Sequence, residues 1–196
     1  MNMRKSIDFL MISKVRIKSL KYFFFNPDMP IHLRGAVRKF KEEINAVRRE
    51  LNRLEEIKLL LTEKRGNRKY YSVNKEHPYY DVLLAMMHKT FGLGGDLLKS
   101  VKKLGEVKYI LLTSSYTQGV TLEPHDVDLV VVGDVDIDLL GEIVGLAEKK
   151  VGKELNYTVL SESDFDLRKK RRDAFVSQLI FGDNVLVYGN KSQFVS

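Results

Sequence analysis

Apolar residues recur at three- and four-residue steps between positions 43 and 57, and this spacing predicts an amphipathic helix. The apolar side consists of Ile44, Val47, Leu51, Leu54 and Ile57. The other side is polar and mostly basic, and it holds Asn45, Arg48, Arg49, Asn52 and Arg53. Such a helix would bury one side against a core and present cations on the other.

A basic hairpin is predicted directly after this helix. Between positions 59 and 73, two short apolar runs flank the segment Lys64-Arg65-Gly66-Asn67-Arg68-Lys69. Gly66-Asn67 is a pair that supplies the positive φ angles of a tight hairpin turn. The turn therefore gathers several cations in a small space.

The segment before the helix extends the pattern. Its spacing predicts a helix from Lys14 to Phe25, which ends at Asn26-Pro27 because proline cannot continue a helix. A short helix through about Phe40 follows. Three short helices and a hairpin form the winged helix-turn-helix layout, in which one helix enters the major groove and the hairpin lies along phosphates.

The order and spacing of these segments resemble ArsR-like winged helix repressors over residues 10 to 90. The resemblance is carried by "NP" after the first helix, by "RRELNRLEEIKLL" and by "EKRGNRKYYSVN". It implies a domain that binds double-stranded DNA, usually as a homodimer. The candidate DNA-binding residues are Asn45, Arg48, Arg49, Arg53, Arg65, Arg68 and Lys69. The alternative explanation for these side chains is a solvated surface without a partner.

The distribution of charge favours a polyanionic partner for the first half of the chain. The formal net charge is +7, from 33 Lys+Arg and 26 Asp+Glu. Residues 1–90 hold 20 of the basic and 10 of the acidic residues, so that half carries +10 and residues 91–196 carry −3. Cationic charge concentrated in one half favours nucleic-acid contact by that half.

Several classes of protein are excluded by composition. The chain has no cysteine, which excludes disulfides and thiolate metal sites. No apolar run reaches the roughly 18 residues that span a membrane. The run from Ile7 to Ile12 is too short for a signal-peptide core. We therefore expect a cytoplasmic protein with no membrane partner.

A change of organisation is predicted after the hairpin. Residues 80–91 read as a helix whose Val82, Leu83, Met86 and Met87 fit either core packing or a dimer contact. Glycines at positions 92, 94 and 95 then indicate a loosened domain boundary. The predicted domains are 1–92, a winged helix domain with a dimer or linker helix, and 96–196. The predicted fold class is therefore a two-domain α+β protein.

The second half holds a candidate site for phosphate and metal. A predicted strand at 107–113 leads into a turn, Ser114 to Gly119, and Asp126 and Asp128 stand at the start of an apolar strand. Two carboxylates spaced two apart on a strand project to one face, where a hard cation relieves their repulsion. A serine-rich turn can offer N–H groups and hydroxyls to a phosphate.

This combination resembles the minimal nucleotidyltransferase domain of the polymerase-beta superfamily, from about Val107 to Tyr188. That family's signature is a Gly-Ser turn, an Arg-Gly pair and Ser-Asp-h-Asp, where h is apolar. The resemblance implies an α/β sheet in which Ser115 holds a nucleotide triphosphate and Asp126 and Asp128 bind Mg²⁺. It also implies a third carboxylate on a later strand, which activates the attacking hydroxyl.

The chain departs from that pattern. Ser114 stands in place of glycine, Gln118 in place of arginine and His125 in place of serine. The later strand is expected at 154–160, where alternation gives the central position to Asn156, which cannot act as a base. The metal pair is retained and the proton acceptor is lost. The helix expected at 138–150 should bury Leu139, Ile143, Leu146 and Ala147.

The sequence thus favours a DNA-binding transcriptional regulator with a degraded nucleotidyltransferase-like sensor domain. One alternative is an active Mg²⁺-dependent nucleotidyltransferase that the winged helix directs to its target, with Ser115, Asp126 and Asp128 as catalytic residues. Another is an antitoxin-like partner of a toxin chain. The operator, the regulated genes and the effector, for which a nucleotide is one candidate, are not encoded in any recognisable pattern.

Overall fold

The computed structural model describes residues 13–118 and 126–196. The predictions for Ile7 to Ile12, Gly119 and His125 lie outside these ranges. Contacts divide the chain into two compact units, Met1–Met87 and His88–Ser196, and each unit is described by itself. In the described ranges, no helix is long and apolar enough to cross a membrane.

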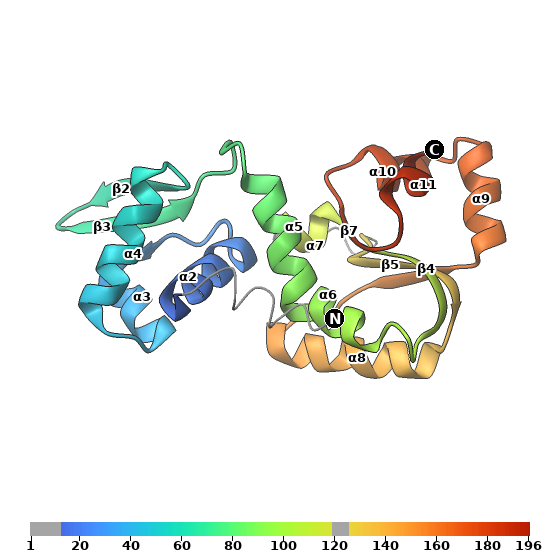
Figure 1. The fold of residues 1–196 in the computed structure, drawn as a ribbon, viewed down its shortest axis with the longest axis horizontal. Coiled ribbons are helices and arrows are strands. Elements are labelled where there is room, and N and C mark those ends of the chain that lie inside the picture. The colour runs from blue at the N-terminus through green and yellow to red at the C-terminus, as the bar shows by residue number, and fades with distance from the viewer. Residues whose placement is uncertain (1–12, 119–125) are drawn as a thin grey trace. The chain divides into compact units, whose positions relative to one another are not determined.

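Within its described residues, the first unit joins three helices to a small antiparallel sheet, and it also includes most of α5 (Tyr80–Thr90) (Figure 1). Its elements in chain order are α2 (Lys14–Phe25), β1 (Ile31–His32), α3 (Leu33–Phe40), α4 (Ile44–Glu56), β2 (Leu60–Arg65) and β3 (Arg68–Val73). The strands are arranged β1-β3-β2, with Ile31 opposite Tyr71 and Leu60 opposite Val73. Side chains cap the helices, as Ser13, His32 and Glu43 each accept a backbone N–H of the first turn.

The core of this unit is formed by the sides of the helices that the spacing predicted. Its buried members are Leu20, Phe23, Phe24, Ala36, Phe40, Val47, Leu51, Leu54, Tyr71 and Val73. Two residues of the predicted apolar side, Ile44 and Ile57, are not buried in this core, because α4 begins at Ile44 and ends before Ile57. Ile57 is 58% exposed just beyond the last turn, and Ile44 is also exposed.

The hairpin turn differs in one angle from the expectation. Arg65 pairs with Arg68, so Gly66 and Asn67 form a two-residue turn. Gly66 has a positive φ of 58°, whereas Asn67 is not among the residues with positive φ. A positive φ at the first central position alone is the pattern of a type II′ turn, which suits the twist of a hairpin.

The two units divide within α5 (Tyr80–Thr90), between Met87 and His88. The second unit continues with α6 (Gly92–Ser100), β4 (Gly105–Leu112), α7 (Ser114–Gln118), β5 (Leu129–Val135), α8 (Ile137–Val151), β6 (Tyr157–Leu160), α9 (Glu162–Lys170), α10 (Ala174–Phe181), β7 (Val185–Tyr188) and α11 (Lys191–Val195). The chain thus has a mixed α and β architecture.

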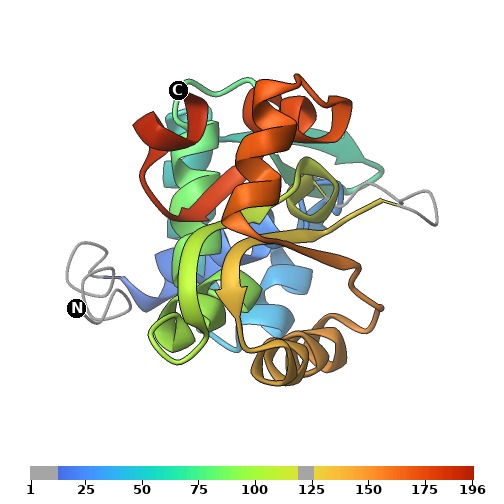
Figure 2. The ribbon, with the colours of Figure 1, turned by 90° about the vertical axis from the view of Figure 1, so that its right-hand side faces the viewer.

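A four-stranded sheet, ordered β6-β5-β4-β7, forms the centre of the second unit. β5 is parallel to β6, and β4 is antiparallel to both β5 and β7. Helices cover both faces, with α8 on one side and α9 and α10 on the other (Figures 1 and 2). On the latter side, sheet residues such as Tyr109 and Val130 pack against Phe165, Val176 and Phe194.

Glycines 94 and 95 are buried in α6 and do not loosen the chain. A Cβ atom at Gly94 would lie 2.3 Å from the carbonyl oxygen of His88, and one at Gly95 would lie 2.4 Å from that of Thr90. Real Cβ atoms do not approach backbone so closely. These glycines therefore allow the end of α5 and the start of α6 to pack tightly.

Two expectations for the second unit are wrong in detail. β6 begins at Tyr157 and is shorter than the predicted 154–160, because the residues before it bond to side chains of other segments. In α8, Leu146 is 57% exposed, and the buried residues are Leu140, Ile143, Val144 and Ala147. That set follows the helical steps of three and four, so the predicted side was turned by about one residue.

Candidate functional site

The carboxylate pair precedes β5, which begins at Leu129. The backbone N–H of Asp128 donates to the carbonyl oxygen of Asn156 at 2.7 Å, and the carbonyl oxygen of Asp128 accepts from the N–H of Thr113 at 3.1 Å. Asp128 is therefore held between the ends of β4 and β6. Its side chain is almost fully buried, whereas Asp126 is partly exposed.

Both oxygens of the Asp128 carboxylate have protein donors. Oδ2 accepts the backbone N–H of Asn156 at 3.0 Å. Oδ1 lies 3.3 Å from Nζ of Lys153, and this ion pair joins a carboxylate that is 1% exposed to a lysine that is 42% exposed. The charge of Asp128 is thus balanced by a lysine from the loop between α8 and β6, a residue that the sequence interpretation missed.

Asn156 lies beside Asp128, where the resemblance places the third carboxylate. Leu129 pairs with Tyr157 in the parallel register, and Asp128 and Asn156 are the residues directly before this pair. The side-chain Nδ2 of Asn156 donates to the carbonyl oxygen of Asp126 at 3.1 Å. A neutral amide cannot take a proton from an attacking hydroxyl, and here it orders the loop.

The serine turn is also bonded within the protein. It forms the short helix α7, in which Ser115 occupies the first turn. The backbone N–H of Ser114, which would face a phosphate in the resemblance, donates to Oδ1 of Asn184 at 2.9 Å. Nδ2 of Asn184 in turn donates to the carbonyl oxygens of Gln178 and Leu179. A phosphate would have to replace a bond that is already made.

Tyr116 anchors α7 to the interior. Its ring meets the ring of His88 edge to face, with centroids 5.7 Å apart. Burial raises the pKa of Tyr116 to about 12, and a backbone hydrogen bond with Leu93 partly opposes this rise. Thr117 Oγ1 donates to the carbonyl oxygen of Thr113 at 3.1 Å. α7 is therefore fixed by its buried side.

These residues do not fit a two-metal centre. The described side chains contain no group of three or more His, Cys, Asp or Glu that could hold a metal ion. The contacts of Asp128 give the physical reason, since an ammonium and an N–H already occupy its oxygens. Mg²⁺ would need those oxygens at close range. The cation expected at Asp126 and Asp128 stays a prediction.

The first unit presents polar and basic residues at the start of α4. Asn45, Arg48 and Arg49 are exposed, as their spacing predicted. Nη1 of Arg48 donates to Oδ1 of Asn45 at 2.7 Å, so these two side chains are held as a pair. The carboxylate of Glu43 accepts the N–H groups of Asn45 and Ala46, both at 2.8 Å. This cap fixes the first turn on which the pair stands.

Two basic residues of the hairpin form ion pairs, one within the hairpin and one with α4. Arg65 lies 2.7 Å from Glu63, and both side chains are exposed. Lys69 pairs with Glu55 of α4, and Thr62 also donates to Glu55. This second pair ties the hairpin to α4. Exposed pairs such as the first contribute little and exchange readily for other partners.

Further cations lie close to these residues and were not among the predicted contacts. Burial, and then the positive charges of Arg68, Arg38 and Arg34, lower the pKa of His32. The hairpin residue Arg68 and two arginines of α3 therefore share one electrostatic neighbourhood. The signal in the sequence was the four-residue step between Arg34 and Arg38, which places both on one side of a helix.

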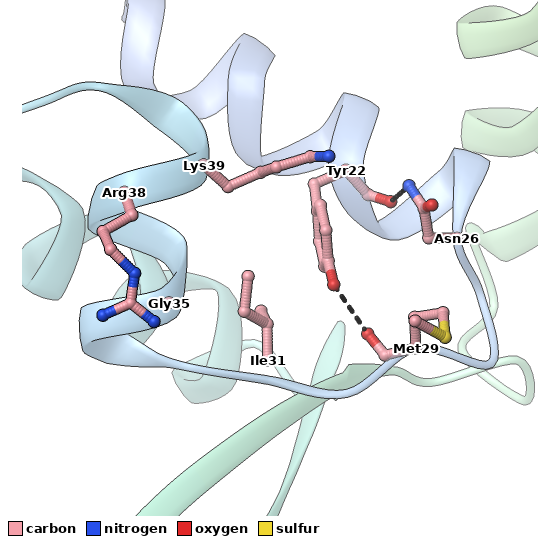
Figure 3. Close-up of a pocket in the computed structure, with 7 residues that line it drawn as sticks. All are labelled: Tyr22, Asn26, Met29, Ile31, Gly35, Arg38 and Lys39. Atoms are coloured by element: carbon pink, nitrogen blue, oxygen red, sulfur yellow. Dashed lines mark hydrogen bonds between the residues drawn. The ribbon is translucent and has the colours of Figure 1, made fainter. Parts of the chain in front are cut away.

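A pocket of about 400 Å³ lies between α2, β1 and α3 (Figure 3). It is lined by Tyr22, Asn26, Met29, Ile31, Gly35, Arg38 and Lys39. The hydroxyl of Tyr22 donates to the carbonyl oxygen of Met29 at 3.1 Å, and Nδ2 of Asn26 donates to the carbonyl oxygen of Tyr22 at 2.8 Å. These bonds hold the turn after α2 against the helix.

Comparison with known proteins relates part of the chain to a protein named as a putative adenylyltransferase. No protein-family model matches the chain. Over 69 residues it is 39% identical to "Putative protein adenylyltransferase MJ0604" of Methanocaldococcus jannaschii, and the aligned region covers 35% of this chain and 68% of that protein. Among solved structures, human N-acetylserotonin methyltransferase in complex with SAM matches with a TM-score of 0.29 and 18% identity, over 61% of this chain and 37% of that chain. That likeness is too weak to support an argument.

Proposed function

The chain belongs to the nucleotidyltransferase-like family of the Methanocaldococcus jannaschii protein, and we propose that it joins such a module to a DNA-binding domain and acts as a transcriptional regulator. In this proposal the first unit is a winged helix domain that binds double-stranded DNA. The second unit is a nucleotidyltransferase-like module that has lost metal-dependent transfer and serves as a sensor or assembly module.

The observation that carries the DNA-binding proposal is the exposed start of α4 beside a basic hairpin. Asn45, Arg48 and Arg49 stand on a capped first turn, and Arg65 and Arg68 stand at the hairpin turn. The order α2-α3-α4-β2-β3 supports a winged helix. In that geometry the start of α4 would reach base edges, and the hairpin would contact phosphates.

The loss of transfer is supported by three contacts in the second unit. Asn156 stands where a carboxylate would accept a proton, Lys153 pairs with Asp128, and Asn184 accepts the N–H of Ser114. The amide of Asn156 replaces the base, and the other two contacts use groups that the reaction would need for metal and phosphate. Together they leave these particular groups bonded within the protein.

Salt-dependent binding to duplex DNA tests the first part. Each contacted phosphate releases counterions, so log K should fall against log salt with a slope of about −0.9 per contact. We expect the variant Arg49→Ala/Arg65→Ala/Arg68→Ala to weaken binding and flatten this slope. The matched control is Lys102→Ala/Lys103→Ala/Lys149→Ala, which removes the same charge from exposed positions of the second unit. Equal losses in both variants would contradict the proposed interface.

An active nucleotidyltransferase is the second candidate, and the name of the archaeal relative favours it. Asp126 and Asp128 are retained, and Ser115 stands in the turn that would hold a triphosphate. Incubation with Mg²⁺ and labelled nucleoside triphosphates, with the chain itself and a co-purified toxin-like chain as acceptors, tests this candidate. Nucleotide transfer by the wild type that is absent in Asp126→Asn/Asp128→Asn would contradict the proposed loss of activity and favour the enzyme.

A second copy of the chain is the partner that the DNA-binding proposal requires for a palindromic site. Val82 and Tyr79, at the start of α5, are exposed large side chains, and they support a contact of this kind. Mass measurement by light scattering would test it. We expect a dimer in the wild type and a monomer after Val82→Glu, with α5 still folded.

A further inference from the structure

We infer that Lys153 takes the place of a metal ion at Asp128. Its ammonium group neutralises the buried carboxylate, so the intact chain does not take up a divalent cation at this position. Removal of the lysine charge should open the position to a cation. This inference rests on the proposed loss of metal-dependent transfer and names the residue responsible for it.

A carboxylate as buried as that of Asp128 needs a nearby positive charge. An ionised group removed from water without a partner costs several kcal/mol in effective terms. Among the described residues, the backbone N–H of Asn156 and Nζ of Lys153 donate to this carboxylate, and of these two the lysine carries the full charge. It is therefore the group that makes an ionised Asp128 tolerable inside the unit.

A lysine and a divalent ion cannot share this carboxylate. Mg²⁺ binds carboxylate oxygens at about 2.0–2.1 Å and demands a nearly octahedral set of ligands. Nζ of Lys153 lies 3.3 Å from Oδ1, on the oxygen that such an ion would use. Two cations bound to the same carboxylate oxygen would repel each other. A metal ion would have to displace the lysine and lose the energy of the existing pair.

The local chain explains why the lysine reaches the site. α8 ends at Val151, and Gly152 turns the chain with a positive φ of 78°. Oε1 of Glu148 then accepts the backbone N–H of Leu155 at 2.8 Å, which holds the loop against the helix. Lys153 and Asn156 both stand in this short loop. One segment therefore supplies both the cation and the amide that stand in place of metal and carboxylate.

Titration of the full chain with Mn²⁺, followed by electron paramagnetic resonance of the free ion, tests the inference. The variants are Lys153→Met, which keeps the length of the side chain without its charge, and Lys153→Arg, which keeps a charge. The control is Lys149→Met, an exposed lysine on α8. We expect Lys153→Met to bind one Mn²⁺ at least about tenfold more tightly than the wild type, because the competing positive charge beside the carboxylate is removed.

Three further results complete the test. The gain in Lys153→Met should vanish when Asp128→Asn is added, and Lys153→Arg and Lys149→Met should behave like the wild type. Mn²⁺ should also raise the melting temperature of Lys153→Met, because the ion replaces the lost charge. Absence of any gain in folded Lys153→Met would overturn the inference.

The wild type supplies a test that does not depend on the stability of the lysine variant. One Mn²⁺ bound to the wild type and lost in Asp128→Asn would also overturn the inference, because Lys153 would then not exclude the ion. The DNA-binding assay and the transfer assay are separate readouts. Failure of either one therefore remains distinguishable from failure at Lys153.

Discussion

Arg16 and Glu50 join α2 to α4 through an ion pair in which the carboxylate is buried and the guanidinium is partly exposed. Nε of Arg16 lies 2.7 Å from Oε1 of Glu50, and Glu50 is 2% exposed. Arg53 is a second cation near this carboxylate, at 4.0 Å. The helix that presents Asn45, Arg48 and Arg49 is therefore anchored by a charge on its buried side.

Removal of Arg16 should destabilise the first unit, because Glu50 would keep its charge without its main partner. We expect Arg16→Ala to lower the free energy of unfolding by about 2–3 kcal/mol. Arg16→Lys should recover part of this loss. The chain has no tryptophan, so circular dichroism in urea is the suitable measurement. The exposed Lys14→Ala is the control, and an equal loss there would show that the pair is not responsible.

Two glycine substitutions should have opposite effects on stability, because Gly94 lies where α5 and α6 pack closely and Gly145 lies at an uncrowded position of α8. Gly94→Ala would place a Cβ 2.3 Å from the backbone oxygen of His88, so we expect a loss of about 2–3 kcal/mol. Gly145→Ala in α8 meets nothing closer than 4.0 Å, and should stabilise by up to about 1 kcal/mol through helix propensity. Thermal unfolding of both variants checks the pair. A neutral Gly94→Ala would contradict the packing described for these helices.

Alkaline stability should depend on Tyr116. Its pKa lies at about 12 in the folded chain and at its ordinary 10.0 when unfolded, so the unfolded state loses the proton first. The stability from this group is complete below pH 10 and is lost as pH rises towards 12. Phenylalanine does not titrate. Between pH 10 and pH 12, the unfolding free energy of Tyr116→Phe should therefore fall by roughly 2–3 kcal/mol less than that of the wild type.

The measurement for Tyr116 is the unfolding free energy at several alkaline pH values. Tyr79→Phe, at an exposed position, is the matched control and should keep the wild-type pH dependence. Near-ultraviolet absorbance of the folded chain should show one fewer late-titrating tyrosine after Tyr116→Phe. Identical alkaline profiles for the two variants would refute the assignment to Tyr116.

Sequence readout by α4 should be separable from phosphate contact by the hairpin. Arg49→Ala is expected to lose about 1–3 kcal/mol at a site selected from random duplexes, if its guanidinium contacts a guanine edge. Arg68→Ala should instead weaken binding to selected and random duplexes alike, because phosphates are the same in both. Competition between the two duplexes measures the ratio of the affinity for the selected duplex to the affinity for random duplexes. An unchanged ratio for Arg49→Ala would remove this residue from base readout.

Local patterns in the sequence determined much of the first unit. The spacing of Val47, Leu51 and Leu54 fixed the buried side of α4, Pro27 followed the end of α2, and Gly66 marked the hairpin turn. These features depend on neighbours within a few residues. Helical periodicity, proline geometry and the freedom of glycine act at that range, and they can be read without knowing the fold.

The sequence also indicated which position beside Asp128 mattered. Alternation along the strand pointed to Asn156 as the replacement for a third carboxylate, and the structure places its N–H against Asp128. Alternation failed for the limits of β6, because hydrogen bonds to Glu148 and Asp128 take up the backbone before Tyr157. Bonds to distant residues leave no periodic trace in the chain.

Only the tertiary structure decided what satisfies the polar groups of the second unit. Lys153 is 25 residues from Asp128, and Asn184 is 70 residues from Ser114. Nothing in the local sequence around either pair predicts a contact, because such contacts follow from the order β6-β5-β4-β7 and the loops that this order brings together. The same holds for Gly94, which looks like a flexible linker residue in the sequence and is a close contact in the fold. Sequence fixes which chemical groups are present, and the packing of distant segments decides which of them remain available to a ligand.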